Sequence, residues 1–309
     1  MTLGPIEWAL LLALAFVWGG SFFFGAVALD ELPPLTVLLA RVGLAAVALN
    51  IGLILVGRSL FGYRRWWGAF LVMGLINNVI PFGLILWGQT HIASGLASIL
   101  NAATPVFTVL LAHYLTRDEQ LTGWKLGGVL MGFAGVAAMI GPEAFTGFGD
   151  HVLGEVAIVG AALSYAFASI WGRRFRDLPP VATATGQVSA SALVVLPIVL
   201  VIDQPWDLAA PGMITWGALI GLALVSTALA YVMYFRILRT AGASNLMLVT
   251  LLVPVFAIAL GVGILGETLA WRHIIGMAVI GLGLLAIDGR LPAWLARLGV
   301  LPGARNKDC

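Results

Sequence analysis

Residues 105–135 read PVFTVLLAHYLTRDEQLTGWKLGGVLMGFAG, and residues 254–283 read PVFAIALGVGILGETLAWRHIIGMAVIGLG. Both stretches contain Pro-Val-Phe, then Glu-x-Leu, and then two glycines. The first glycine comes seven residues after the leucine, and the second glycine comes seven residues after the first. The Pro-Val-Phe strings are offset by 149 residues and the Glu-x-Leu strings by 148, which a one-residue insertion within 116–118 explains. Two strings at nearly the same offset indicate that the chain is a tandem duplication.

The composition around these strings is that of a membrane protein. Of the 309 residues, 61% are hydrophobic and 10% are charged, and the mean hydropathy is +1.04. A soluble domain carries about 25% charged residues. The net charge is only +2, and no cluster of lysines and arginines in the sequence is large enough to bind along a phosphate backbone, so we expect no nucleic-acid partner. The single cysteine, Cys309, excludes an intrachain disulfide and a cysteine metal site.

Ten apolar stretches are long enough to cross a bilayer, which takes about 20 residues as a helix. They are residues 7–29, 34–56, 67–88, 93–115, 123–141, 153–172, 181–202, 212–235, 242–265 and 272–288. The sequence therefore predicts an all-α polytopic membrane protein with ten transmembrane helices and no soluble domain.

Five spans fall in each copy, and because five is odd the second copy must enter the membrane from the opposite side. We therefore expect two inverted five-helix repeats, residues 5–145 and 151–289, followed by a cytoplasmic tail, residues 290–309. Inverted repeats are typical of secondary transporters, whose substrate site lies between the halves near the midplane.

The basic residues predict the orientation. Arg272 lies on one side and Arg41 lies inside a span, whereas all the others fall on the opposite side. Because basic residues favour the cytoplasm, we expect both termini to be cytoplasmic in a cell (inner) membrane. The residues assigned to the cytoplasmic side are Arg58, Arg64, Arg65, Arg117, Lys125, Arg173, Arg174, Arg176, Arg236, Arg239, Arg290, Arg297, Arg305 and Lys307.

One family shows this combination of features. The first helix contains Trp18-Gly19-Gly20-Ser21, the second contains Arg41, and a Pro-Val-Phe helix precedes Glu-x-Leu and a glycine-rich helix in both copies. The pattern resembles the drug/metabolite transporter superfamily, EamA-type, over residues 5–289. The resemblance implies transport of amino acids, other metabolites or drugs, commonly outward, through a cavity built from the first, third, fourth, sixth, eighth and ninth helices.

Within the superfamily the chain is most similar to the branch that exports aromatic and other neutral amino acids. That branch often has a second tryptophan in the sixth helix, where this chain has Tyr165. The resemblance therefore implies a small neutral or aromatic amino acid, or a related metabolite, as the substrate.

Prolines inside the spans select the first candidate site residues. A helical proline separates from the carbonyl four residues earlier and leaves it without its usual donor. Pro81, Pro105 and Pro254 are the predicted helix kinks, and the residues concerned also have polar side chains. The freed carbonyls are those of Asn77, Asn101 and Thr250. These three residues and Asn78, a further polar residue deep in the same span as Asn77, are the substrate-binding candidates. The alternative is that these groups satisfy one another between packed helices.

Aromatic residues far from the helix ends give the remaining candidates. Trp18, Tyr165 and Tyr231 lie deep within their spans, where tryptophans and tyrosines of an interfacial belt do not occur. We expect them to line a substrate cavity, with ordinary helix packing as the alternative. Arg41 is the only basic residue well inside a span, and we expect it to extend outward or to hold helices together through a carbonyl, with binding as the alternative.

The acidic and histidine residues argue against several other functions. No Asp or Glu lies near the middle of a span, which disfavours an exporter of hydrophobic or cationic drugs, the main alternative. We expect Glu119 and Glu267 to cap helix N-termini, and we expect proton coupling, if any, to be weak and to use a rim group such as His91.

No catalytic set can be assembled within the membrane, and no Walker-type nucleotide motif is present. We therefore expect no enzyme activity, no metal and no cofactor. The expected partners are a small-molecule substrate and the lipid bilayer, with a functional monomer. A non-transporting membrane scaffold is the remaining alternative.

Overall fold

The computed structural model describes residues 5–115, 122–140, 150–241, 248–287 and 289–297. Every regular element in these ranges is a helix. In the first half they are α1 (Pro5–Leu29), α2 (Pro34–Leu55), η1 (Leu60–Trp66), α3 (Trp67–Gly74), η2 (Leu75–Val79), α4 (Ile80–Gln89), α5 (Ser94–Asn101), α6 (Thr104–Leu115) and α7 (Gly123–Ile140). In the second half they are α9 (Asp150–Gly172), η3 (Arg173–Phe175), α10 (Pro180–Ile202), α11 (Met213–Ile220), η4 (Gly221–Leu229), α12 (Ala230–Ala241), α14 (Leu248–Ile264), α15 (Trp271–Ile287) and α16 (Arg290–Arg297).

The all-helical membrane fold is confirmed, whereas the count of ten spans stays a prediction. Within the described ranges, seven helices are long and apolar enough to cross a membrane when consecutive segments such as α3, η2 and α4 are joined. Three further apolar helices are shorter: Gly123–Ala138, Leu252–Ile264 and Trp271–Ile287. They occupy the fifth, ninth and tenth positions of the predicted order.

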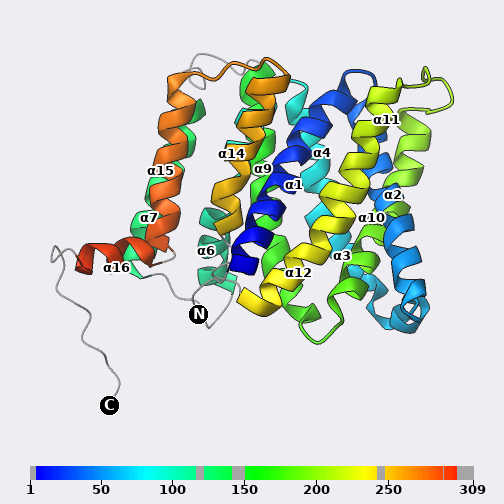
Figure 1. Ribbon diagram of the computed structural model, residues 1–309, viewed down its shortest axis with the longest axis horizontal. Helices are drawn as coiled ribbons and strands as arrows, with labels where there is room; N and C mark the ends of the chain where they lie inside the picture. The colour runs from blue at the N-terminus through cyan, green and yellow to red at the C-terminus, as the bar shows by residue number, and fades with distance from the viewer. Residues whose placement is uncertain (1–4, 116–121, 141–149, 242–247, 288, 298–309) are drawn as a thin grey trace.

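The connections between helices gather at two opposite faces (Figure 1). The upper one, called here the Glu267 face, includes the α1–α2 turn, where Glu31 accepts a hydrogen bond from the Gly212 amide ahead of α11 (2.6 Å). At the start of α9, a ring nitrogen of His151 lies 2.7 Å from the carbonyl oxygen of His91, which follows α4. The lower one, called the Arg173 face, includes η1 and the α9–α10 turn.

The two halves therefore run in opposite directions, since α9 begins near the face at which α1 ends. The packing pairs follow the same relation: α1 packs on α14, and the corresponding helices of the other half, α9 and α6, also pack together. Helices α2 and α10 pair with each other, as do α7 and α15.

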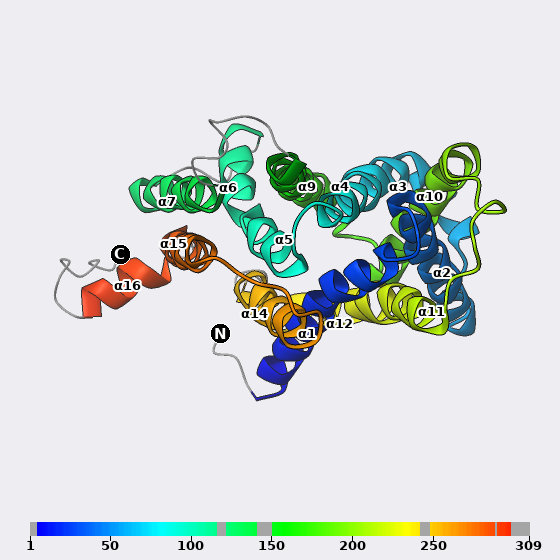
Figure 2. The same ribbon diagram turned by 90° about the horizontal axis from the view of Figure 1, so that it is seen from above.

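Seen from above, the helices form two rows that are joined at both ends (Figure 2). One row contains α7, α6, α9, α4 and α3, and the other contains α15, α14, α1, α12 and α11. At the α7–α15 end the backbones approach closely, because a Cβ atom built on Gly128 would lie 2.5 Å from the carbonyl oxygen of Gly283. Small residues permit this approach between membrane helices.

Candidate substrate cavity

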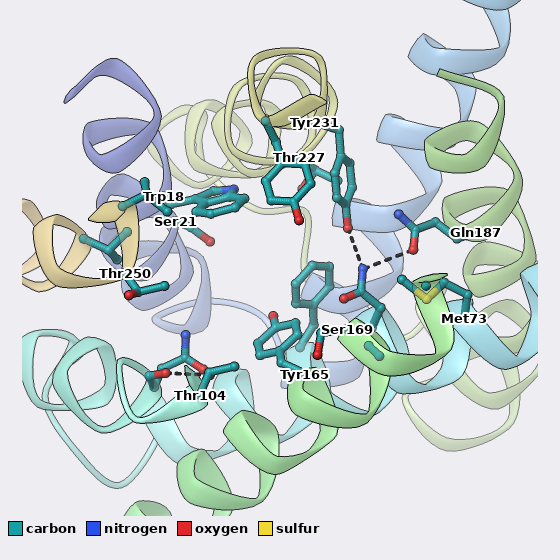
Figure 3. A pocket seen from close by; sticks show the side chains of 18 of the residues that line it. Trp18, Ser21, Met73, Thr104, Tyr165, Ser169, Gln187, Thr227, Tyr231 and Thr250 are labelled. Carbon is teal, nitrogen blue, oxygen red and sulfur yellow. Dashed lines mark hydrogen bonds between the residues drawn. The ribbon is translucent and has the colours of Figure 1, made fainter. Parts of the chain in front are cut away.

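A cavity of about 640 Å³ lies between the two rows and is lined by both halves of the chain (Figure 3). Arg173, Arg176 and Pro180 are exposed and belong to its lining, so the cavity opens at the Arg173 face. No described residue of the connections at the Glu267 face lines it. The cavity is therefore accessible from one face.

Aromatic rings form much of its wall. The three aromatic residues that the sequence selects, Trp18, Tyr165 and Tyr231, all line the cavity. Two further rings lie beside them: Tyr234 is 5.9 Å from Trp18 and Phe82 is 6.4 Å from Tyr165, measured between ring centroids. Tyr234 was not among the candidates selected from the sequence, although it lies one helical turn beyond Tyr231 on the same side of the helix.

A hydrogen-bond network connects α10, η2 and α12 at one side of the cavity. The Asn77 amide donates to the Gln187 side-chain oxygen (3.1 Å) and to the Tyr231 hydroxyl (3.2 Å), as Figure 3 shows. The Tyr231 hydroxyl donates in turn to Asn78 Oδ1 (3.0 Å), and the Asn78 amide donates to Ser191 Oγ (2.9 Å). Asn78 is fully buried and is not among the lining residues, so its hydrogen bonds hold helices together.

Asn101 and Thr250 both line the cavity, and they come from different halves. The carbonyl of Asn101 is not open as expected, because the Thr104 hydroxyl donates to it (2.7 Å). The side-chain oxygen of Asn101 is buried and has no hydrogen-bond partner among the described residues. The free acceptor at this position is therefore the side chain rather than the backbone.

The three predicted kinks have different structures. Pro105 lines the cavity at the start of α6, where the helix is interrupted between Asn101 and Thr104. Pro81 lies in the first turn of α4, directly after the π-helical segment η2, whose turns are wider than those of an α-helix. Pro254 lies inside α14, and neither it nor Pro81 is a lining residue. π-Helical turns are frequent at functional sites.

Arg41 also lines the cavity, and its side chain does not extend to a surface, since only 5% of the residue is exposed. Its Nε donates to the Thr227 hydroxyl (3.1 Å), and its Cζ lies 3.6 Å from the centroid of the Phe82 ring. The Thr227 hydroxyl donates to the Leu222 carbonyl (2.8 Å) inside the π-helical segment η4. A hydroxyl and a ring thus hold Arg41 where a carbonyl was expected.

The charges on the lining are of one sign. Arg41, Arg173 and Arg176 belong to it, and no described Asp or Glu does. No group of three or more metal-binding side chains gathers anywhere in the described ranges.

The Glu267 face is closed above the cavity by contacts between the halves. Glu267 accepts hydrogen bonds from the Ser94 amide (2.6 Å) and the Gly95 amide (3.0 Å) at the start of α5. A further contact lies within the first half, where Gln89 at the end of α4 donates to the Phe22 carbonyl of α1 (2.8 Å). Glu267 thus caps a helix as expected, but the helix belongs to the other half. Glu119, its counterpart in the first repeat, lies outside the described residues.

Two opposed helical halves around a cavity that opens at one face define a membrane protein of the transporter class. The EamA-like transporter family model matches residues 6–141 and 152–287, and the chain belongs to this family. The resemblance inferred from the repeated strings is thereby confirmed, while the amino-acid exporter branch is not tested.

Curated relatives agree with the family. The chain is similar to the Uncharacterized transporter YoaV of Bacillus subtilis (22% identity over 89% of this chain and 94% of the relative). It is also similar to the Uncharacterized inner membrane transporter YedA of Escherichia coli K12 (27% identity over 87% and 86%). A crystal structure shares the fold, with a TM-score of 0.66 and 19% identity over 94% of this chain and 98% of that one.

Proposed function

We propose that the protein is a secondary transporter or facilitator that moves small neutral or aromatic amino acids, or related metabolites, by alternating access between two inverted five-helix repeats. The observation that carries this proposal is the cavity between the halves, open at the Arg173 face and covered at the Glu267 face by Glu267 and Gln89. A carrier needs such one-sided access so that the substrate site faces one compartment at a time.

The proposed membrane arrangement has ten spans, both termini in the cytoplasm and the Arg173 face inward, in the cell membrane. The basic residues support it because Arg58 lies in the α2–η1 connection, Arg64 in η1 and Arg173 in η3, all at the Arg173 face. Two variants test this arrangement, each with one new cysteine introduced into a Cys309→Ser background. Asp150→Cys should react with an impermeant maleimide on intact cells and Gly62→Cys should not. Labelling of position 62 alone would overturn the arrangement.

The lining supports a substrate with a flat or apolar group. The rings of Trp18, Tyr165 and Tyr234 provide surfaces for stacking. Export of cationic drugs, the alternative, is disfavoured because arginines line the cavity and no described carboxylate does. We propose that transport follows the substrate gradient or couples weakly to protons through a rim group such as His91, and that the monomer functions alone.

Uptake into proteoliposomes tests the transport function. A panel of radiolabelled neutral and aromatic amino acids, organic acids and a lipophilic cation is offered with and without a pH gradient. We expect saturable uptake of at least one aromatic solute. Trp18→Ala should alter which solutes are taken up. The matched control Trp206→Ala, at an exposed position of the Glu267 face, should leave the selectivity unchanged. Absence of saturable uptake for every solute would refute transport of these classes and favour a scaffold, and uptake of the cation alone would favour the drug exporter.

A further inference from the structure

Arg41 is a buried cation with few partners. Its side chain lies in α2 against the cavity, and the residue is 5% exposed. A guanidinium has five N–H groups, and within the described ranges only Nε–H has an acceptor, the Thr227 hydroxyl at 3.1 Å. No described carboxylate lies within ion-pair distance of it, and no lining residue in these ranges is acidic. The two Nη groups therefore retain unused donors beside the cavity.

Such a group is costly unless it is paired. Taking an ion out of water and into a protein interior has a penalty that a single neutral hydrogen bond does not offset. The ring of Phe82, 3.6 Å from Arg41 Cζ, stabilises the positive charge and fixes the plane of the guanidinium. Thr227 fixes its Nε edge. These two contacts orient the Arg41 fork but do not neutralise it.

A planar fork with free donors matches a carboxylate, which accepts two parallel hydrogen bonds from it. The other arginines of the lining, Arg173 and Arg176, are exposed at the opening, where they raise the local concentration of anions. Asn101 also lines the cavity, and its side-chain oxygen has no hydrogen-bond partner among the described residues. The charge pattern thus favours an anionic group over a cationic one.

We propose that Arg41 binds the carboxylate of the transported solute and makes that carboxylate the feature by which substrates are selected. The proposal rests on the transport function proposed above and narrows its substrate to aromatic or apolar molecules that carry a carboxylate, amino acids included. Arg41 is then the anchoring group, the rings of Trp18 and Tyr165 contact the apolar part, and Asn101 accepts from an ammonium or hydroxyl group.

Acid and amide pairs of equal shape test the proposal without any mutation. The probes are 3-phenylpropanoate against 3-phenylpropanamide, and L-phenylalanine against L-phenylalaninamide and phenethylamine. Two quantities are measured: uptake or counterflow in proteoliposomes, and the increase in melting temperature of the purified protein that each probe causes. We expect the acids to be transported and to stabilise the protein, with the uncharged and cationic analogues at least about tenfold weaker because they lack the charged acceptor.

Variants then assign the selectivity to one residue. Arg41→Gln should lose the preference for acids in both measurements, and Arg41→Lys, which keeps the charge but not the fork, should retain part of it. The matched control is Arg174→Gln, because Arg174 stacks on Trp171 (3.2 Å from Cζ to the ring centroid) and is not a lining residue. The control should keep the wild-type preference.

The outcomes separate this proposal from the transport function. Uptake of amides or amines as efficient as that of acids, or an acid preference that survives in Arg41→Gln, would overturn the role of Arg41 while leaving transport established. Absence of uptake and of thermal stabilisation for all five probes would refute transport of this class and the role of Arg41 with it. If Arg41→Gln fails to fold, the wild-type acid and amide pairs and Arg41→Lys decide the question.

Discussion

Glu267→Gln should release the contact that covers the cavity at the Glu267 face. The carboxylate accepts from the amides of Ser94 at 2.6 Å and Gly95 at 3.0 Å, and it joins the α14–α15 connection of one half to the first turn of α5 in the other. The amides at a helix N-terminus carry partial positive charge, so a carboxylate there is favoured. Opening this face requires the two halves to separate at that point.

The size of the effect follows from the bonds lost. A hydrogen bond to a charged group contributes about 1.5–3 kcal/mol, whereas a neutral one contributes about 0.5–1.5 kcal/mol. Glutamine keeps one neutral acceptor in place of two charged bonds, so these values give a loss of about 1.5–5.5 kcal/mol for the closed arrangement. Because Glu267 is only half-buried, we take the lower end, about 2 kcal/mol, which is about a 30-fold shift towards the open arrangement.

Cysteine accessibility measures this shift. In a Cys309→Ser background, Ser21→Cys places a thiol on the cavity wall with little change of shape. An impermeant maleimide offered from the Glu267 face should label it slowly, and about 30-fold faster after Glu267→Gln. Asp207→Asn is the matched control: it removes a carboxylate of the same face, and the Asp207 side chain has no hydrogen bond to any described residue.

Equal labelling rates for the Glu267→Gln variant and its parent would refute the role of Glu267 as a closing contact. An increase of the same size in Asp207→Asn would attribute the effect to the charge of the face rather than to the two hydrogen bonds. Labelling offered from the Arg173 face verifies that the thiol is reactive, because the cavity already opens there.

Three further changes distinguish binding groups from structural ones. Asn101→Ala should weaken substrate binding by about 0.5–1.5 kcal/mol, seen as a higher KM, with an unchanged melting temperature because its Oδ1 has no protein partner. Tyr231→Phe should lower the melting temperature, because it leaves the buried Asn78 Oδ1 without a donor at a cost of about 1–3 kcal/mol. Gly128→Ala should destabilise the α7–α15 contact by about 1–3 kcal/mol while Gly127→Ala, which meets nothing within 4 Å, should not; the opposite ranking in thermal melts would contradict the packing.

The sequence predicts the helices and the duplication well because both depend on local information. Apolar length locates the spans, and strings such as the two copies of Pro-Val-Phe persist whatever surrounds them. It does not show which side of a helix meets the cavity, because residues that face lipid and residues that face protein are both apolar. Trp18 was found because its depth is unusual, whereas Gln187 and Phe82 were missed because nothing in their neighbourhood sets them apart.

The prediction that a helical proline frees the carbonyl four residues earlier identified a residue of the cavity wall, Asn101, but named its backbone oxygen instead of its side-chain oxygen as the free acceptor. A carbonyl freed at membrane depth is satisfied again by a nearby hydroxyl or by a local change of helix type. The Thr104 hydroxyl does so for Asn101, and the π-helical segment η2 precedes Pro81. Similarly, Asn78 was selected as polar and deep, but three-dimensional contacts with Ser191 and Tyr231 use its hydrogen bonds. The alternative of mutual satisfaction between helices describes Asn78, and the binding role stays a prediction for Asn101.

Arg41 also bears on how the transport cycle is driven. While the cavity is open, water can solvate its unused donors, but closing an empty cavity on both sides removes that water at a cost of several kcal/mol. A bound carboxylate would replace the lost solvation, so the loaded carrier should change face more easily than the empty one. Exchange of labelled for unlabelled 3-phenylpropanoate should then run faster than net uptake, and Arg41→Gln should abolish the difference. Equal rates of exchange and net uptake in the wild type would show that closing the empty cavity is not the slow step.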